Sequence, residues 1–172
     1  AVVMTYWNPI ERYGVDKFAQ AISDHGGSGV ITPDLTVEES QGWIAATDAS
    51  KINRIYVVAP STSDSRLPVV TSKCGGFVYA ASLMGVTGAR NSVSSGAADL
   101  VARIRTTTDL PVAVGLGVST REQAKGVAAY ADGVIVGSAF IKALQDAPNE
   151  EAGLAAVKEL ATELAKGVRE GR

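Results

Sequence analysis

The sequence has 172 residues, of which 46% are hydrophobic and 20% charged, which is enough apolar material for the core of one globular domain. Its 16 basic and 18 acidic side chains leave a formal charge of −2, which offers no basic surface for nucleic acid or an anionic membrane, and no apolar run reaches the roughly 18 residues of a membrane span. One cysteine, Cys74, and one histidine, His25, exclude an internal disulfide and a zinc-binding cluster, so we expect no metal and a reducing, cytoplasmic setting.

Short apolar runs rich in Val, Ile and Tyr alternate with amphipathic segments along the whole chain. In chain order, the runs predict strands at 2–7, 29–32, 54–59, 76–81, 111–116 and 133–137. The amphipathic segments have the apolar spacing of helices with one buried face, and they predict helices around 15–22, 97–104, 124–131 and 151–169. We expect the last helix to bury Leu154, Val157, Leu160, Ala161, Leu164 and Val168.

Polar residues mark several of the predicted helix ends. Thr36 with Glu39, and Ser119 with Glu122, fit the capping box in which two side chains satisfy the first free amides of a helix. We therefore expect one helix to begin near residue 37 and another just after Ser119. His25 precedes a glycine-rich stretch and is typical of a C-terminal cap.

The alternation of apolar strands and helices predicts a parallel sheet covered by helices, in a single domain over residues 1–172. Two architectures share this pattern, the open doubly wound sheet and the (β/α)8 barrel. A complete barrel needs about 250 residues, so the strand count favours an open sheet. The glycine motifs favour a barrel of which only about six βα units are present.

Two neighbouring strands end in glycine. "VGLGVST" (114–120) contains Gly115 and Gly117, and "DGVIVGSAF" (132–140) contains Gly137 followed by Ser138. The carboxyl ends of parallel strands form the functional edge of such folds, where bare backbone amides and a helix N-terminus can bind phosphate. The alternative is that these glycines only permit tight turns. A third stretch, "SLMGVTGAR" (82–90), is interpreted either as a loop over the ligand or as a plain connector.

Five blocks resemble the alpha subunit of tryptophan synthase, in that family's order and spacing: "MTYWNPIERYG" (4–14), "VITPDLTVEES" (30–40), "GFVYAASLMGVTGAR" (76–90), "VAVGLGVST" (112–120) and "GVIVGSAFIK" (133–142). The resemblance implies a (β/α)8 TIM barrel whose third to eighth strands are represented here. It also implies retro-aldol cleavage of indole-3-glycerol phosphate to indole and glyceraldehyde 3-phosphate. The partner would be a beta subunit, which carries pyridoxal phosphate, and the chain itself would need no cofactor.

The resemblance also implies site residues. The substrate phosphate would be held by the backbone of Gly88, Gly117, Gly137 and Ser138. The apolar indole pocket would be lined by Tyr6, Ile31 and Leu116, with Tyr79 beside the reacting atoms and Asp34 as a polar group at a strand tip. Asp34 has the alternative role of a turn or capping carboxylate before the helix expected at 37, and Tyr79 that of a core aromatic.

The family's general acid and base are a glutamate and an aspartate in a block resembling "ELGIPFSDP", and the sequence has no such block. No catalytic residue is therefore assigned within the chain, and we expect it to be inactive alone. Two missing strands would expose sheet edges, which favours either a retained N-terminal segment or self-association.

The residues alone leave two other functions open. The chain could be a non-catalytic phosphate-binding or assembly module, an open six-stranded sheet that dimerises through its edges. It could also be another phosphate-handling barrel, an isomerase or epimerase, which would share the glycines but not "GVTGAR". A dinucleotide-binding fold is disfavoured because no G-x-G-x-x-G follows the first strand.

Overall fold

The structure is a computed structural model that describes residues 1–81, 93–115 and 117–172. The contacts within it divide the chain into two compact units. Unit 1 contains Ala1–Tyr79 and Arg103–Pro111, and unit 2 contains Ala80–Ala102 and Val112–Arg172. Each unit is described by itself, and the single domain expected over 1–172 stays a prediction.

Unit 1 is built on a three-stranded parallel sheet in the order β1-β2-β3. Val3 of β1 is in register with Val30 of β2, which is in register with Arg54 of β3. All three residues of β2 are buried and all three of β1 are exposed. The elements are β1 (Val2–Met4), α1 (Trp7–Tyr13), α2 (Val15–Asp24), β2 (Gly29–Ile31), α3 (Gln41–Ser50), β3 (Asn53–Ile55), β4 (Val57–Val58), α4 (Leu67–Thr71) and the first residues of β5 (Val78–Ala81).

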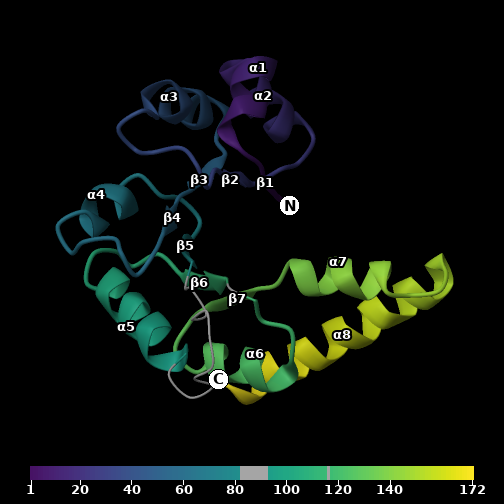
Figure 1. The fold of residues 1–172 in the computed structure, drawn as a ribbon. Helices are drawn as coiled ribbons and strands as arrows, with labels where there is room; N and C mark the ends of the chain where they lie inside the picture. The colour runs from purple at the N-terminus through teal and green to yellow at the C-terminus, as the bar shows by residue number, and fades with distance from the viewer. Residues whose placement is uncertain (82–92, 116) are drawn as a thin grey trace. The chain divides into compact units, whose positions relative to one another are not determined.

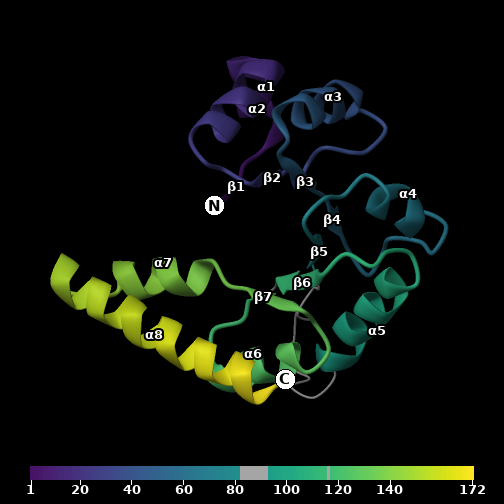
Figure 2. The ribbon, with the colours of Figure 1, turned by 180° about the vertical axis from the view of Figure 1, so that it is seen from behind.

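The core of unit 1 lies between this sheet and the helices α1, α2 and α3, which lie on one side of it (Figures 1 and 2). Trp43 of α3 is 1% exposed and is the largest fully buried side chain among the described residues. Its ring stands 6.0 Å from that of Trp7 in an edge-to-face contact and 6.3 Å from that of Phe18. Aromatic burial of this kind is a large favourable term in folding, so three helices are fixed by one side chain.

Three predictions for unit 1 need correction. The run predicted as a strand over 2–7 ends at Met4, and Trp7 begins α1, which the periodicity did not predict. The strand predicted over 54–59 is interrupted at Tyr56, between β3 and β4. The helix expected from residue 37 is α3, which begins only at Gln41, because residues 37–39 form bends and Thr36 donates to the Glu39 carboxylate (3.4 Å) instead of capping a helix.

Other predicted features are confirmed. His25 is the C-cap of α2, and one of its ring nitrogens lies 2.8 Å from the carbonyl oxygen of Ala21. All four apolar residues predicted to form the buried face over 97–104 are buried. The capping box expected at Ser119 lies one residue further on: Thr120 is the N-cap of the helix and Gln123 completes the box.

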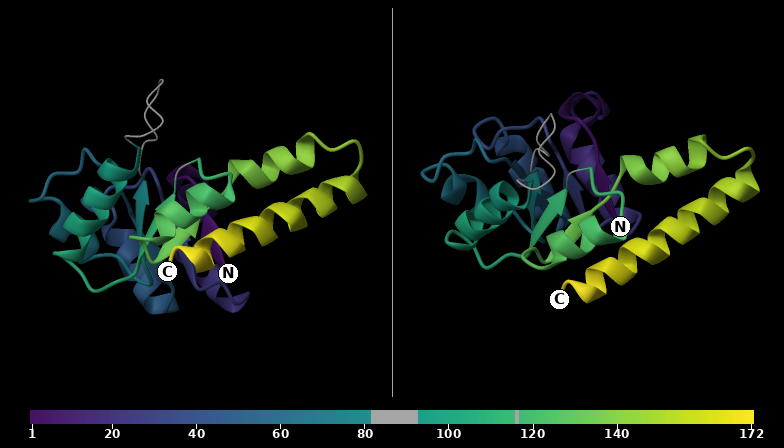
Figure 3. Two further views of the ribbon diagram at one scale, coloured as in Figure 1. Left: turned by 90° about the horizontal axis from the view of Figure 1, so that it is seen from below. Right: turned by 60° about the horizontal axis from the view of Figure 1, so that its bottom comes forward.

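Unit 2 contains a parallel pair of strands, β6 (Val112–Gly115) and β7 (Gly133–Ile135). Val114 is in register with Val134, and Gly115 with Ile135. The helices are most of α5 (Val93–Arg105), α6 (Arg121–Ala128), α7 (Ser138–Gln145) and α8 (Glu150–Glu170). α7 and α8 run side by side in opposite directions, and the C-terminal half of α8 crosses α6 (Figure 3).

The apolar stripe predicted for the last helix is only partly buried. Leu164 is buried, but Leu154 is 58% exposed and Ala161 is exposed as well. Gly153, next to Leu154, is buried against Leu144 of α7, so α7 covers a different face of this part of α8 from the one that bears Leu154. Helical periodicity indicates which face is apolar, and only the packing partners decide how much of it is buried.

Glycines at the C-terminal end of α8 allow a close approach to α6. A Cβ at Gly167 would collide with the backbone carbonyl of Arg121, and one at Gly171 with that of Lys125. Since backbone atoms cannot rotate away, we expect Gly167→Ala to lower the free energy of unfolding by about 1–3 kcal/mol in urea titrations. The matched control is Gly126→Ala on α6, where a Cβ has open space and helix propensity favours alanine by about 1 kcal/mol. Equal stability of Gly167→Ala and the parent chain would contradict this close packing.

Candidate functional site

The glycine-tipped strands lie at one edge of unit 2. Gly115 and Ile135 form the last registered pair of the parallel strands β6 and β7. Gly117 and Gly137 each follow that pair by two residues, so both leave the sheet at the same carboxyl edge. Ser138, the first residue of α7, follows Gly137 directly and, like both glycines, is exposed. Gly88 and Leu116 lie outside the described residues.

The backbone at Gly137 is open. No atom lies within 4 Å of the position a Cβ would take, and φ is −127°, outside the left-handed region that favours glycine. Gly137 is the N-cap of α7 and its carbonyl accepts the N–H of Phe140 (3.0 Å), but no side chain caps the helix. Packing within the described residues therefore does not require a glycine there.

Gly117 is different because its φ is +58°, in the left-handed region that favours glycine. The tight-turn interpretation is supported at Gly117 by this positive φ. The arrangement at the start of α7 presents the free amides and the positive dipole end of a helix to an open surface. Such a place binds an anion without the help of a charged side chain.

Asp34 serves as a cap in unit 1. Its two carboxylate oxygens accept the backbone N–H of Trp7, at 2.9 and 3.1 Å, and so satisfy the first residue of α1. The capping alternative predicted from the sequence is supported, although the helix is α1 and not one that begins at 37. Tyr6 is the N-cap residue of α1, and its side chain is 66% exposed.

Ile31 and Tyr79 also belong to unit 1. Ile31 ends β2, is buried, and is in register with Met4 and Ile55. Tyr79 is half-buried, and its backbone N–H donates to the carbonyl of Tyr56 (3.3 Å). Burial raises the pKa of the Tyr79 phenol. The hydroxyl therefore stays protonated near neutral pH.

A hollow of about 180 Å³ opens beside Asp34 and includes residues that the sequence did not suggest. Arg66 lines it, and its guanidinium donates to both carboxylate oxygens of Glu38, each at 2.8 Å. This hydrogen-bonded pairing lowers the pKa of Glu38 to about 2. The two residues are 28 positions apart, so no local pattern in the sequence could have predicted the pair.

The described residues also bear on two other kinds of feature, metal sites and membrane-spanning helices. Within residues 1–81, 93–115 and 117–172, no group of three or more His, Cys, Asp or Glu side chains is placed to hold a metal ion. In the same ranges, no helix combines the length and the apolar character needed to cross a bilayer.

Comparison with known protein families identifies the family of this chain. The family model described as "Tryptophan synthase alpha chain" matches residues 1–169. The chain belongs to the tryptophan synthase alpha chain family. The tryptophan synthase alpha chain of Streptomyces avermitilis is 59% identical over 170 residues, which cover 99% of this chain and 61% of the relative.

Solved structures of the same family show the same fold. A Mycobacterium tuberculosis tryptophan synthase structure gives a TM-score of 0.87 at 51% identity, covering 98% of this chain and 62% of that one. A mutant tryptophan synthase alpha subunit of Pyrococcus furiosus gives 0.80 at 33% identity, with 98% and 66% covered. The predicted (β/α)8 barrel family is confirmed by this likeness. The chain spans about three fifths of the length of its curated relatives.

Proposed function

We propose that the chain forms the phosphate-binding part of a tryptophan synthase alpha subunit, a lyase of tryptophan biosynthesis. The reaction is retro-aldol cleavage of indole-3-glycerol phosphate to indole and glyceraldehyde 3-phosphate, with a beta subunit as the partner. No cofactor is assigned to this chain, and pyridoxal phosphate belongs to the beta subunit. The free cysteine Cys74 fits a cytoplasmic setting.

The observation that carries the proposal is the open backbone at Gly137. A glycine with empty space at its Cβ position, at the uncapped start of α7, leaves room for an anion to approach the backbone amides. Gly117 lies at the same edge of the β6-β7 pair, so its backbone can contribute to the same phosphate. We assign Ser138 and, from the family motif, Gly88 to this group as well.

The remaining site residues are assigned from the family motifs. Tyr6, Ile31 and Leu116 line the indole pocket in this proposal, and Tyr79 borders the reacting atoms. Asp34 takes a positioning role, because both of its oxygens already accept the N–H of Trp7 and hold the start of α1, next to Tyr6.

Cleavage needs two proton transfers that this chain does not support. One proton is delivered to the indole carbon, and one is removed from the glycerol hydroxyl as the carbon–carbon bond breaks. Each positioned acid or base contributes about 10²–10⁴-fold to such a reaction. Near the strand ends of unit 1, the Asp34 carboxylate accepts the backbone N–H of Trp7, and the Glu38 carboxylate pairs with Arg66. We therefore propose that the 172 residues bind the phosphate but do not turn over substrate alone.

Protection against thermal unfolding tests the phosphate site. Glyceraldehyde 3-phosphate at a hundredfold excess over its Kd is expected to raise the Tm by about 5–10 °C, because binding at that excess stabilises the folded state by about 2.7 kcal/mol. Glyceraldehyde without the phosphate is the control and should give no shift. Equal Tm values with and without the phosphorylated ligand would refute the site. The isomerase or epimerase alternative gains no support from the family match.

A further inference from the structure

One apolar cluster in unit 2 connects the two strand ends of the candidate phosphate site. Its buried members are Val118, Ala124 and Leu164, and Val136 and Phe140 are among the partly buried side chains that pack against them. Val118 follows the first of the two exposed glycines directly, and Val136 and Phe140 lie on either side of the second. The cluster therefore joins the two stretches of backbone that bear the glycines, although they follow different strands.

The start of α7 depends on this cluster for its position. Gly137 and Ser138 lie past the last registered residue of β7, and among the described residues no side chain caps the helix. None of the eight residues of α7 is buried. Phe140 stands in the first turn, where its backbone N–H donates to the carbonyl of Gly137 (3.0 Å) and its ring packs against the cluster. The placement of the first amides of α7 therefore follows from how Phe140 packs.

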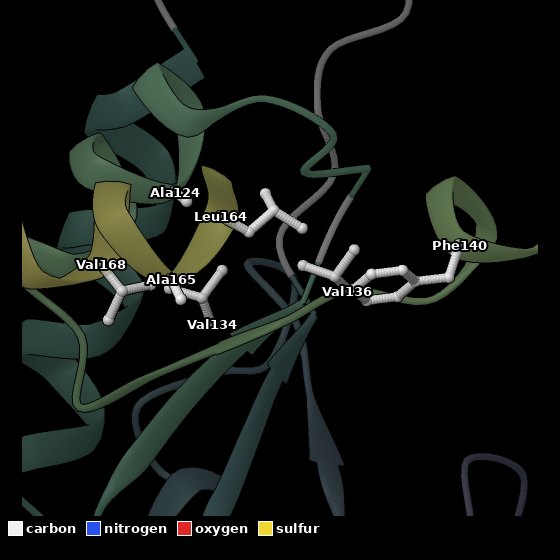
Figure 4. Close-up of a pocket in the computed structure, with 7 residues that line it drawn as sticks. All are labelled: Ala124, Val134, Val136, Phe140, Leu164, Ala165 and Val168. Carbon is white, nitrogen blue, oxygen red and sulfur yellow. The ribbon is translucent and has the colours of Figure 1, made fainter. Parts of the chain in front are cut away.

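Leu164 is the buried side chain that α8 contributes to the cluster. It is 6% exposed, and Figure 4 shows it pointing toward Val136 and the ring of Phe140. α8 packs on both neighbouring helices, because Gly167 allows a close approach to the backbone of α6 and Gly153 is buried against α7. Leu164 lies between these two glycines in the sequence. It is therefore held on a helix that contacts the elements on both sides of the site.

The contacts of Leu164 are not backed by a filled core. A hollow of about 280 Å³ lies between β7 and the helices α6, α7 and α8, and Leu164, Val136 and Phe140 are among its lining residues (Figure 4). Side chains at a void have no partner atoms on that side, so few neighbours can replace a contact that is lost. Shortening Leu164 would enlarge a space that already exists and would free the start of α7 to shift.

We propose that Leu164 is a positioning residue for phosphate binding. It holds Val118 and Phe140 in one cluster, and so fixes the spacing between the two stretches of backbone that bind the anion. Leu164 is buried and acts only through these neighbours. A site made of backbone amides depends on their placement, because hydrogen bonds weaken steeply once the donor angle falls below about 120°. The inference rests on the proposed function, since it presupposes phosphate at Gly117 and Gly137.

The affinity for inorganic phosphate tests this role, measured through the backbone amide resonances of the isotope-labelled chain. Leu164→Ala is expected to raise the Kd about tenfold, which corresponds to the loss of roughly one hydrogen bond. Leu164→Met conserves the volume and should restore the Kd to within about twofold of the parent chain. The matched control is Leu67→Ala in unit 1, which removes a leucine that is 1% exposed. It should lower the Tm as Leu164→Ala does, but leave the Kd unchanged.

A second measurement needs no ligand. Leu164→Ala should shift the amide resonances of Val118 and Phe140 together, because both residues pack in the same cluster. If the alanine variant does not fold, Leu164→Val replaces it, with a smaller rise in Kd of about two- to fivefold.

Three results would overturn the proposal. One is a folded Leu164→Ala chain with the Kd of the parent, and another is unchanged resonances of Val118 and Phe140 in that variant. The third is equal weakening in Leu67→Ala, which would show that general stability sets the affinity. In all three the parent chain still binds phosphate. A parent chain that binds none would refute the proposed function together with this role, so the two failures are distinguishable.

Discussion

Replacing Gly137 by aspartate is expected to abolish protection by glyceraldehyde 3-phosphate. The new side chain would occupy the open space above the start of α7 and place a carboxylate where the phosphate binds. Two unit charges about 4 Å apart repel by about 1 kcal/mol in water and about 4 kcal/mol at an effective dielectric constant of 20. We therefore expect the Kd to rise by about one to three orders of magnitude, measured by calorimetry and by loss of the thermal shift.

A matched control keeps this result interpretable. Gly42 lies in the first turn of α3, and it too has no atom within 4 Å of a Cβ position. Gly42→Asp adds the same charge at another helix start, so its folding and its phosphate affinity should match those of the parent chain. Undiminished protection in Gly137→Asp would remove the phosphate site from α7. Gly117→Asp is a poorer test, because its φ of +58° strains any side chain.

Lyase activity is expected to be undetectable in the 172-residue chain and to appear when the preceding segment of a relative is added. The family resemblance implies that this segment carries the block with the glutamate and aspartate, and two positioned acid–base groups together account for about 10⁴–10⁸-fold in rate. Indole release from indole-3-glycerol phosphate is the measurement. The same segment with both carboxylates changed to amides is the control and should bind without restoring turnover. Turnover by the chain alone would show that the acid and base lie within these residues.

Local patterns predicted most of the helices and strands because the spacing of apolar residues within each element largely determines its type. The stripe Ala97, Leu100, Val101 and Ile104 is fully buried, since a single helix face determines it. The seven-residue helix α1 was missed because it is too short for periodicity and its N-terminus is held by Asp34, 27 residues away. Leu154 was expected to be buried, but burial depends on which helices pack on α8, and periodicity contains no information on that.

Some features of the candidate site can likewise be predicted from local sequence, and others depend on the fold. Gly117, Gly137 and Ser138 were predicted because glycine at a strand end has few physical explanations. The register of β6 and β7 places the two strand ends at one edge, and their binding of phosphate stays a prediction. The pairing of Arg66 with Glu38 could not be predicted, because it joins distant positions through the fold. Both Gly117 and Gly137 have open space where a Cβ would lie; their φ values of +58° and −127° distinguish them, and only coordinates could show this.

Titration of the isotope-labelled chain with inorganic phosphate, followed through its backbone amide resonances, tests the central claim most directly. The account predicts that the amides of Gly117, Gly137 and Ser138 shift together and fit one Kd, since one anion contacts all three. Amide resonances that shift only elsewhere in the chain, or that fit separate and unrelated affinities, would contradict it.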